Sequence, residues 1–271
     1  MTGAPAFAKI NLALVVGPLR EDGKHEVVTV LQRIALHDDV ELEPANELLV
    51  EGFDGDTIVG EALVALARAA GVAPRWRVRI EKRIPVAAGL GGGSTDAAAA
   101  LTLANAILAQ PFGKDRLHAV AADVGADVPF FLCEGAQLGT GDGTELTPVA
   151  LPADYHVVLV LPNESAKSST ATVYEAFDAR GGAAGFESRA ASVRSGLTTI
   201  ETVHELASLP PNDLASSPVA QRLTELGAVR ADVSGAGPTV YGLFERTDAA
   251  QRAGEALADV GRTMVTRPVA R

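Results

Sequence analysis

The chain has 271 residues, of which 47% are hydrophobic and only 4% aromatic, and its formal net charge is −11 at pH 7. The acidic excess argues against a broad nucleic-acid-binding surface, because neutralising phosphates requires clustered lysine and arginine. Cys133 is the only cysteine, so no disulfide can form within the chain, and no apolar run is long enough to span a bilayer. We therefore expect a cytoplasmic protein without nucleic-acid or membrane partners.

The first half of the chain is predicted to mix strands and helices. Residues 6–16 have the alternating pattern of a strand, which places Lys9 and Asn11 on one side and apolar residues on the other. The other elements predicted here are a strand over 27–44, an amphipathic helix over 57–70, a strand over 75–85, a helix over 94–109, and a helix over 114–124 that ends at Gly125.

In the second half, a hydrophobic run over 156–162 is predicted to begin a second domain, and 178–196 is the best candidate for a mobile surface insertion. A helix over 216–227, a strand over 239–244 and a helix over 248–260 complete the chain. Because helices and strands are mixed without a repeated strand–helix rhythm, we expect an α+β fold. Its expected domains are an N-terminal domain, 1–152, and a C-terminal domain, 153–271.

The segment PVAAGLGGGSTDAAAA, residues 85–100, concentrates glycines directly before a predicted helix. It lacks the third glycine of a dinucleotide-binding loop, the lysine of a Walker loop and the last glycine of a nucleophile elbow. Glycines let backbone N–H groups approach an anion closely, and a helix starting at Ser94 would add free amides and a positive dipole end. The segment therefore predicts a phosphate-binding loop, with a purely structural turn as the alternative.

Ser94 and Thr95 follow these glycines at the expected start of the helix. Their hydroxyl groups could cap the helix, contact a phosphate oxygen or bind Mg2+. The sequence alone leaves these roles open.

Three stretches, in the same order, resemble the motifs of the GHMP kinases, a superfamily of small-molecule kinases that includes homoserine and mevalonate kinases. They are AKINLAL at 8–14, the glycine segment at 85–100, and SGAGPTVYGLF at 234–244. The resemblance implies an N-terminal domain like ribosomal S5 domain 2 and a ferredoxin-like C-terminal domain. It also implies ATP and Mg2+ as ligands, with Mg2+ bridging ATP phosphates near Ser94.

Finer features resemble one branch of this superfamily. They are GKHE at 23–26, GADVPFFL at 125–132, GTGDGTELTPV at 139–149 and PPNDL at 210–214. Enzymes of this branch use ATP to phosphorylate the tertiary 2-hydroxyl of 4-diphosphocytidyl-2-C-methyl-D-erythritol in the non-mevalonate route to isoprenoids. The implied partner is therefore a small cytidine diphosphate-linked polyol.

The resemblance assigns site residues to the matching positions of this sequence. Asp127 corresponds to the catalytic aspartate and Lys9 to its basic partner. The implied ATP site consists of Pro85, Val86, Ala87, Ala88, Gly89, Leu90, Gly91, Gly92, Gly93, Ser94 and Thr95, with Thr57 near the adenine. The implied substrate site consists of Asn11, Lys24, His25, Thr170, Tyr174, Gly235, Ala236 and Gly237.

The residues by themselves leave other interpretations open. Lys9 and Asn11 could face solvent, Asp127 could be an ordinary turn residue, and His25 could be a surface turn histidine. Relatives usually have an aromatic residue immediately before this histidine, which stacks on the base. This chain has Lys24 there, whose aliphatic stem can still cover one face of a ring.

Two other functions are open. A GHMP kinase for another alcohol, such as homoserine or mevalonate, would share the three motifs, although GKHE and GADVPFF argue against it. A catalytically silent ligand-binding relative would not need Lys9 and Asp127, yet both are present.

Overall fold

The computed structural model describes residues 2–53, 58–163 and 169–270, so Thr57 lies outside the described residues. The chain forms two compact units. Strands β1 (Thr2–Leu19) and β2 (His25–Pro44) are each divided between the two units. Unit 1 consists of residues 1–8, 36–86 and 91–134, and unit 2 consists of residues 9–35, 87–90 and 135–271.

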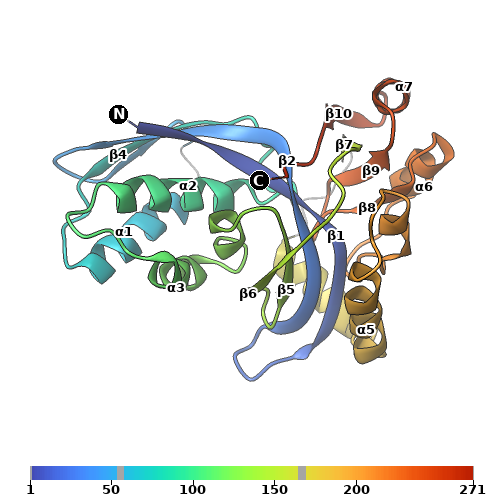
Figure 1. Cartoon of the computed structure of the whole chain (residues 1–271), viewed down its shortest axis with the longest axis horizontal. Coiled ribbons are helices and arrows are strands. Elements are labelled where there is room, and N and C mark those ends of the chain that lie inside the picture. Colours follow the sequence, from blue (N-terminus) through green and yellow to red (C-terminus); the bar gives the residue numbers. More distant parts are fainter. Residues whose placement is uncertain (1, 54–57, 164–168, 271) are drawn as a thin grey trace. The chain divides into compact units, whose positions relative to one another are not determined.

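Unit 1 packs three helices against one face of its sheet (Figure 1). Strand β4 (Trp76–Glu81) pairs antiparallel with β2 and parallel with β3 (Leu49–Glu51). Alternate residues of β4 are buried, as its sequence pattern predicts. The helices are α1 (Ile58–Ala70), α2 (Gly92–Ala106) and α3 (Lys114–Val124), and the 3-10 helix η1 (Pro129–Leu132) follows.

Helix α2 begins at Gly92, two residues before the predicted start, and ends at Ala106. The residue that precedes it, Gly91, has the left-handed φ of 71° and carries no side chain that could cap the helix. Ser94 therefore lies inside the first turn. The capping interpretation of Ser94 and Thr95 is wrong for that reason.

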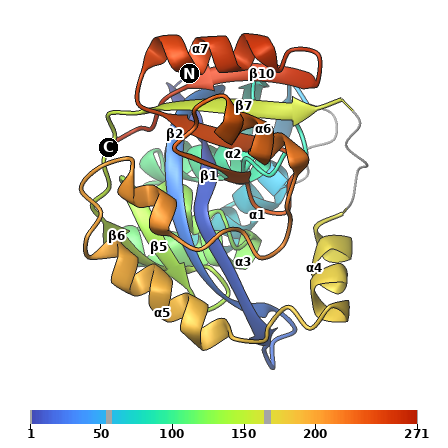
Figure 2. The same cartoon turned by 90° about the vertical axis from the view of Figure 1, so that its right-hand side faces the viewer.

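Unit 2 contains a four-stranded antiparallel sheet in the order β10-β7-β9-β8, of which β10 and β7 are labelled in Figure 2. In chain order this is the 4-1-3-2 arrangement of a ferredoxin-like sheet, as expected from the resemblance. Helices α6 and α7 bury apolar side chains against it. The elements are β7 (His156–Pro162), α6 (Pro218–Glu225), β8 (Arg230–Val233), β9 (Val240–Phe244), α7 (Thr247–Ala256) and β10 (Gly261–Thr266).

Unit 2 also holds the hairpin β5 (Ala136–Thr140) and β6 (Glu145–Val149), in which β5 pairs with β2. Between β7 and α6, the residues that the structure describes form three helical segments. They are α4 (Thr170–Ala179), α5 (Phe186–Leu197) and the 3-10 helix η2 (Glu205–Ser208).

The expected mobile insertion at 178–196 is corrected by the structure, because most of it forms α5. Phe186, Ala190 and Val193 are buried at the spacing of one helix face. The Phe186 ring packs so closely on β1 that a Cβ added at Gly17 would lie 2.9 Å from it. Within the described residues, no helix is long and apolar enough to cross a membrane.

Candidate active site

Lys9 and Asn11 lie on β1 and are both only 4% exposed, so the solvent-facing interpretation is wrong. The Lys9 ammonium donates a hydrogen bond to Asn11 Oδ1 at 2.7 Å. Asn11 Nδ2 in turn donates to Thr29 Oγ1 at 2.9 Å, and Thr29 donates to the carbonyl of Ala13 at 2.8 Å. This chain of hydrogen bonds fixes the orientation of the amide and, through it, the position of the ammonium.

The third glycine motif lies directly beside this pair. A Cβ added at Gly235 would be 3.4 Å from Lys9 Nζ and 3.5 Å from Asn11 Oδ1, which are contact distances, so the loop lies directly against this pair. Gly235 has a φ of 58° and Gly237 a φ of 81°, both in the left-handed region. Ala236 between them is partly exposed.

Asn212, from the PPNDL motif, supports the same loop. Its amide donates to the carbonyls of Val233 at 2.9 Å and Gly235 at 2.7 Å, and its Oδ1 accepts from Leu214 N–H at 2.8 Å. Sequence reasoning singled out the motif without giving this asparagine a role. An asparagine directly after two prolines, in a stretch with little other chemistry, was the available signal.

Within the glycine loop, Gly89 makes the closest backbone contact. Its φ is 76°, and an added Cβ would lie 2.3 Å from the Ser234 carbonyl oxygen. Ser234 Oγ donates to the Gly89 carbonyl at 2.9 Å, and Thr239 N–H donates to the Ala88 carbonyl at 3.3 Å. The Lys9 N–H donates to the Leu90 carbonyl at 3.0 Å. Residues 87–90 are thereby attached to the first and third motifs of unit 2.

The remaining loop residues differ in exposure. Val86 and Ala87 are exposed, and Ala87 adopts a φ of 53° although it is not glycine. Ala88 and Leu90 are buried, so they can face a ligand only through their backbone. The partly exposed residues are Pro85, Gly89, Gly91, Gly92, Gly93 and Ser94, whereas Thr95 is buried.

Asp127 lies in the turn between α3 and η1, as the sequence predicts. Helix α3 ends at Val124, Val128 N–H donates to the Gly125 carbonyl at 3.1 Å, and Pro129 begins η1. The Asp127 side chain is partly exposed. It belongs to unit 1, while Lys9 belongs to unit 2, so their pairing stays a prediction from the resemblance.

His25 is 9% exposed and held in an aromatic environment, so the surface-turn interpretation is wrong. Its Nδ1 lies 2.9 Å from the Gly17 carbonyl and must carry the proton there, because a carbonyl only accepts. The imidazole centroid is 5.0 Å from the Tyr174 ring and 5.9 Å from the Phe177 ring, and Nε2 is 3.4 Å from an Asp178 oxygen. Tyr174, Phe177 and Asp178 all belong to α4, whose first residue is the exposed Thr170.

Lys24 does not extend freely from its turn. Its ammonium donates a 2.5 Å hydrogen bond to Asp142 Oδ2 at the tip of the β5–β6 hairpin. Burial alone would raise the pKa of Asp142, but hydrogen bonds from Lys24 and Thr144 outweigh it and lower that pKa to about 2. The two residues therefore form an ion pair at neutral pH.

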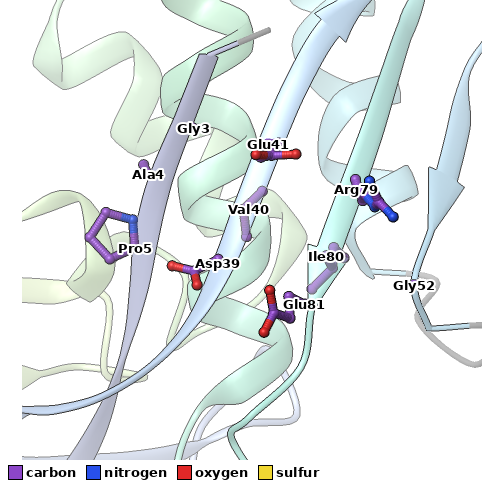
Figure 3. A pocket seen from close by; sticks show the side chains of 10 residues that line it. All are labelled: Gly3, Ala4, Pro5, Asp39, Val40, Glu41, Gly52, Arg79, Ile80 and Glu81. Atoms are coloured by element: carbon purple, nitrogen blue, oxygen red, sulfur yellow. The ribbon is translucent and has the colours of Figure 1, made fainter.

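A hollow of about 780 Å³ opens on the sheet of unit 1 (Figure 3). It is lined by Gly3, Ala4, Pro5, Asp39, Val40, Glu41, Gly52, Arg79, Ile80 and Glu81. Val40 and Ile80 are buried toward the helices, so the hollow lies on the opposite face. Its three carboxylates and single arginine disfavour a polyphosphate, and none of the site residues expected from the sequence lines it.

Two protein-family models match the chain. They are "GHMP kinases N terminal domain" over residues 57–135 and "GHMP kinases C terminal" over residues 191–263. The 4-diphosphocytidyl-2-C-methyl-D-erythritol kinase of Nocardia farcinica is 38% identical, covering 94% of this chain and 89% of its own length. The protein of the same name from Cutibacterium acnes is 36% identical, covering 96% and 91%.

Solved structures agree with these matches. A crystal structure of 4-(cytidine 5'-diphospho)-2C-methyl-D-erythritol kinase superposes with a TM-score of 0.80 at 31% identity, covering 100% of both chains. The mevalonate kinase of Methanococcus jannaschii superposes with a TM-score of 0.77 at 12% identity, covering 99% of this chain and 98% of that one. The second likeness shows a common fold and no more.

Proposed function

Because this chain belongs to the 4-diphosphocytidyl-2-C-methyl-D-erythritol kinases of the GHMP superfamily, we propose that Lys9 and Asp127 are its catalytic residues. The chain is an ATP-dependent small-molecule kinase. Its proposed reaction phosphorylates the tertiary 2-hydroxyl of 4-diphosphocytidyl-2-C-methyl-D-erythritol and releases ADP. The observation that carries this proposal is the buried Lys9–Asn11 pair beside Gly235, because burying an ammonium on a strand is costly without a function.

In this reaction the 2-hydroxyl oxygen forms a bond to the γ-phosphorus, and the bond from that phosphorus to the bridging oxygen breaks. The hydroxyl proton goes to the Asp127 carboxylate, which orients the hydroxyl beforehand. Lys9 offsets negative charge that develops on the transferred group. Asn11 holds the ammonium in place through the 2.7 Å hydrogen bond.

The glycine loop fits a polyphosphate. Left-handed backbone at Ala87, Gly89 and Gly91 turns the chain sharply, and α2 starts at Gly92 without a capping side chain, so the N–H groups of its first turn need an acceptor. When bound, Mg2+ would neutralise negative charge on the phosphates. Ser94 is the hydroxyl proposed to reach it, because Ser94 is partly exposed and Thr95 is buried.

The cytosine of the acceptor is proposed to lie against Tyr174 and His25. Tyr174 offers an aromatic face, and His25 Nδ1 donates to Gly17, so Nε2, which lies 3.4 Å from Asp178 Oδ2, is the ring nitrogen that a base edge would have to reach. Lys24 takes the place of the usual aromatic residue, and its pairing with Asp142 directs the ammonium toward the hairpin β5–β6. Tyr174 would then supply most of the stacking.

A comparison of acceptors tests the proposed reaction. We expect ADP release that depends on 4-diphosphocytidyl-2-C-methyl-D-erythritol, and none with homoserine or mevalonate. ADP release with one of the other two alcohols would assign a different GHMP reaction. A protein that binds the acceptor without releasing ADP would be a silent ligand-binding relative.

Asp127→Asn tests the proton acceptor. We expect kcat to fall by a factor of about 10² or more, because the amide cannot accept the proton. The KM for ATP should change little. The matched control is Asp123→Asn on the exposed side of α3, which should keep wild-type turnover. Near-normal turnover of Asp127→Asn would show that the assignment is wrong.

A further inference from the structure

A buried ion cluster flanks the phosphate loop and has no role in the chemistry above. Lys82, which directly follows β4, donates hydrogen bonds to Asp38 Oδ2 and to Asp96 Oδ2, both at 2.7 Å. Asp38 belongs to β2 and Asp96 to α2, and both are fully buried. These three residues are called the Lys82 cluster below.

Asp38 fixes the chain where it enters the loop. Its Oδ1 accepts hydrogen bonds from the N–H groups of Arg83 at 2.5 Å and Ile84 at 2.8 Å. These two residues directly precede Pro85. A single carboxylate therefore holds Lys82 through one oxygen and the following backbone through the other.

Asp96 fixes the chain where it leaves the loop. It lies on α2 four residues after Gly92, and its bond to Lys82 ties the start of this helix to the residues before the loop. Gly92, the first residue of α2, also lies close to the residues that precede the loop. An added Cβ there would lie 3.1 Å from Ile84 Cγ2 and 3.4 Å from Lys82 Nζ.

The composition of the Lys82 cluster indicates that its role is to position the phosphate loop rather than to stabilise the fold. Two carboxylates share one ammonium, and Asp96 Oδ1 has no hydrogen-bond partner among the described residues. Buried charges are costly, and well-packed apolar residues often replace them without loss of stability. Charge-assisted hydrogen bonds, in contrast, fix the separation of two elements more narrowly than apolar contacts do.

We propose that Lys82 is a positioning residue for ATP, which acts with Asp38 and Asp96 to hold both ends of the phosphate loop in the geometry that binds the triphosphate. This inference rests on the proposed function of the loop. Lys82 acts through the backbone of Ile84 and the start of α2. Its loss should therefore affect the KM for ATP and leave the KM for the acceptor nearly unchanged.

The double variant Lys82→Met/Asp96→Leu tests placement through the KM values of the folded enzyme. It replaces the ion pair by apolar side chains of similar size and leaves Asp38 with its two backbone donors. We expect an ATP KM at least tenfold higher with an acceptor KM near that of the wild type, and a lower denaturation midpoint, because Asp38 stays buried without its ammonium. The milder Asp96→Asn keeps one hydrogen bond to Lys82. It should raise the ATP KM only about threefold, less than the double variant does.

The control is Arg83→Met, which removes surface ion pairs with Asp39 and Glu81 next to the cluster and should keep the wild-type ATP KM. A folded double variant with the wild-type ATP KM would overturn the proposal. If the double variant does not fold, Asp96→Asn becomes the deciding variant. A wild-type ATP KM in Asp96→Asn would then overturn the proposal.

Failure of the proposed function is recognisable separately. A wild-type protein that binds ATP in calorimetry but phosphorylates no acceptor would refute the reaction alone. In that case the ATP Kd of the same variants replaces the KM as the deciding quantity. We expect this Kd to rise in the same order. A wild-type protein that does not bind ATP would refute both.

Discussion

Gly89 is the residue of the phosphate loop that approaches the backbone of the third glycine motif most closely. Gly89→Ala would combine a left-handed backbone with a Cβ 2.3 Å from the Ser234 carbonyl oxygen. We expect it to lower the free energy of unfolding by about 3 kcal/mol and to raise the ATP KM. Gly71→Ala is the matched control, with a φ of 67° and no atom within 4 Å of the added Cβ. It should lose only about 1 kcal/mol in urea unfolding; equal losses would contradict the steric argument.

The Lys24–Asp142 pair makes stability depend on pH in the acid range. The pKa of Asp142 falls from its ordinary 3.8 to about 2 in the folded protein, because hydrogen bonds from Lys24 and Thr144 outweigh burial. The ionised carboxylate therefore stabilises the fold above about pH 4, and this contribution disappears as the pH falls through about 2. Lys24→Met should lower the unfolding free energy by about 1 kcal/mol at pH 5, a value reduced by the half-exposed lysine.

Urea titrations of Lys24→Met and the wild type between pH 2 and pH 5 check this prediction. The difference in unfolding free energy should shrink steadily toward the acid end. Lys24→Arg, which keeps the positive charge, should follow the wild type. A difference that stays constant with pH would mean that Lys24 contributes through packing alone.

At the scale of helices and strands, strong periodicity was sufficient to predict an element, whereas glycines misled the prediction of where α2 begins. Strand β4 and helix α3 follow their alternating and capped patterns closely. Helix α2 starts earlier than predicted because Gly92 and Gly93 are helical despite their low propensity. Close packing explains why glycines occupy these two positions, since a Cβ at either one would lie 3.1 Å from an isoleucine side chain. Helix α5 was missed because its few apolar residues stand among polar ones and glycines.

Helix α5 offers a direct test of that packing. Val193 is fully buried on it, so Val193→Ala should lower the free energy of unfolding by about 2 kcal/mol through the lost contacts and the cavity. Ser192→Ala, on the exposed side of the same turn, should change it by less than about 0.5 kcal/mol. Urea denaturation of both variants measures this. Equal and small effects would indicate that α5 does not hold to β1 in solution.

For the whole molecule, the motifs predict which residues matter but not which contacts hold those residues in place. AKINLAL draws attention to Lys9 and Asn11, and the third motif to Gly235, whereas Thr29, which holds the Asn11 amide, comes from another strand and was given no role. The Lys82 cluster was not predictable, because a single sequence gives no reason to bury two aspartates and a lysine together. Long-range hydrogen bonds of this kind become visible only once the strands are paired.

The two compact units are expected to unfold together, because β1 and β2 each run through both and neither unit can lose a strand alone. The aromatic residues provide one probe for each unit. The only tryptophan, Trp76, is buried in unit 1, and all three tyrosines, Tyr155, Tyr174 and Tyr241, belong to unit 2. Tryptophan fluorescence and tyrosine absorbance should therefore give the same urea midpoint. Two separate midpoints would instead support independent domains, such as those expected from the sequence on either side of residue 152.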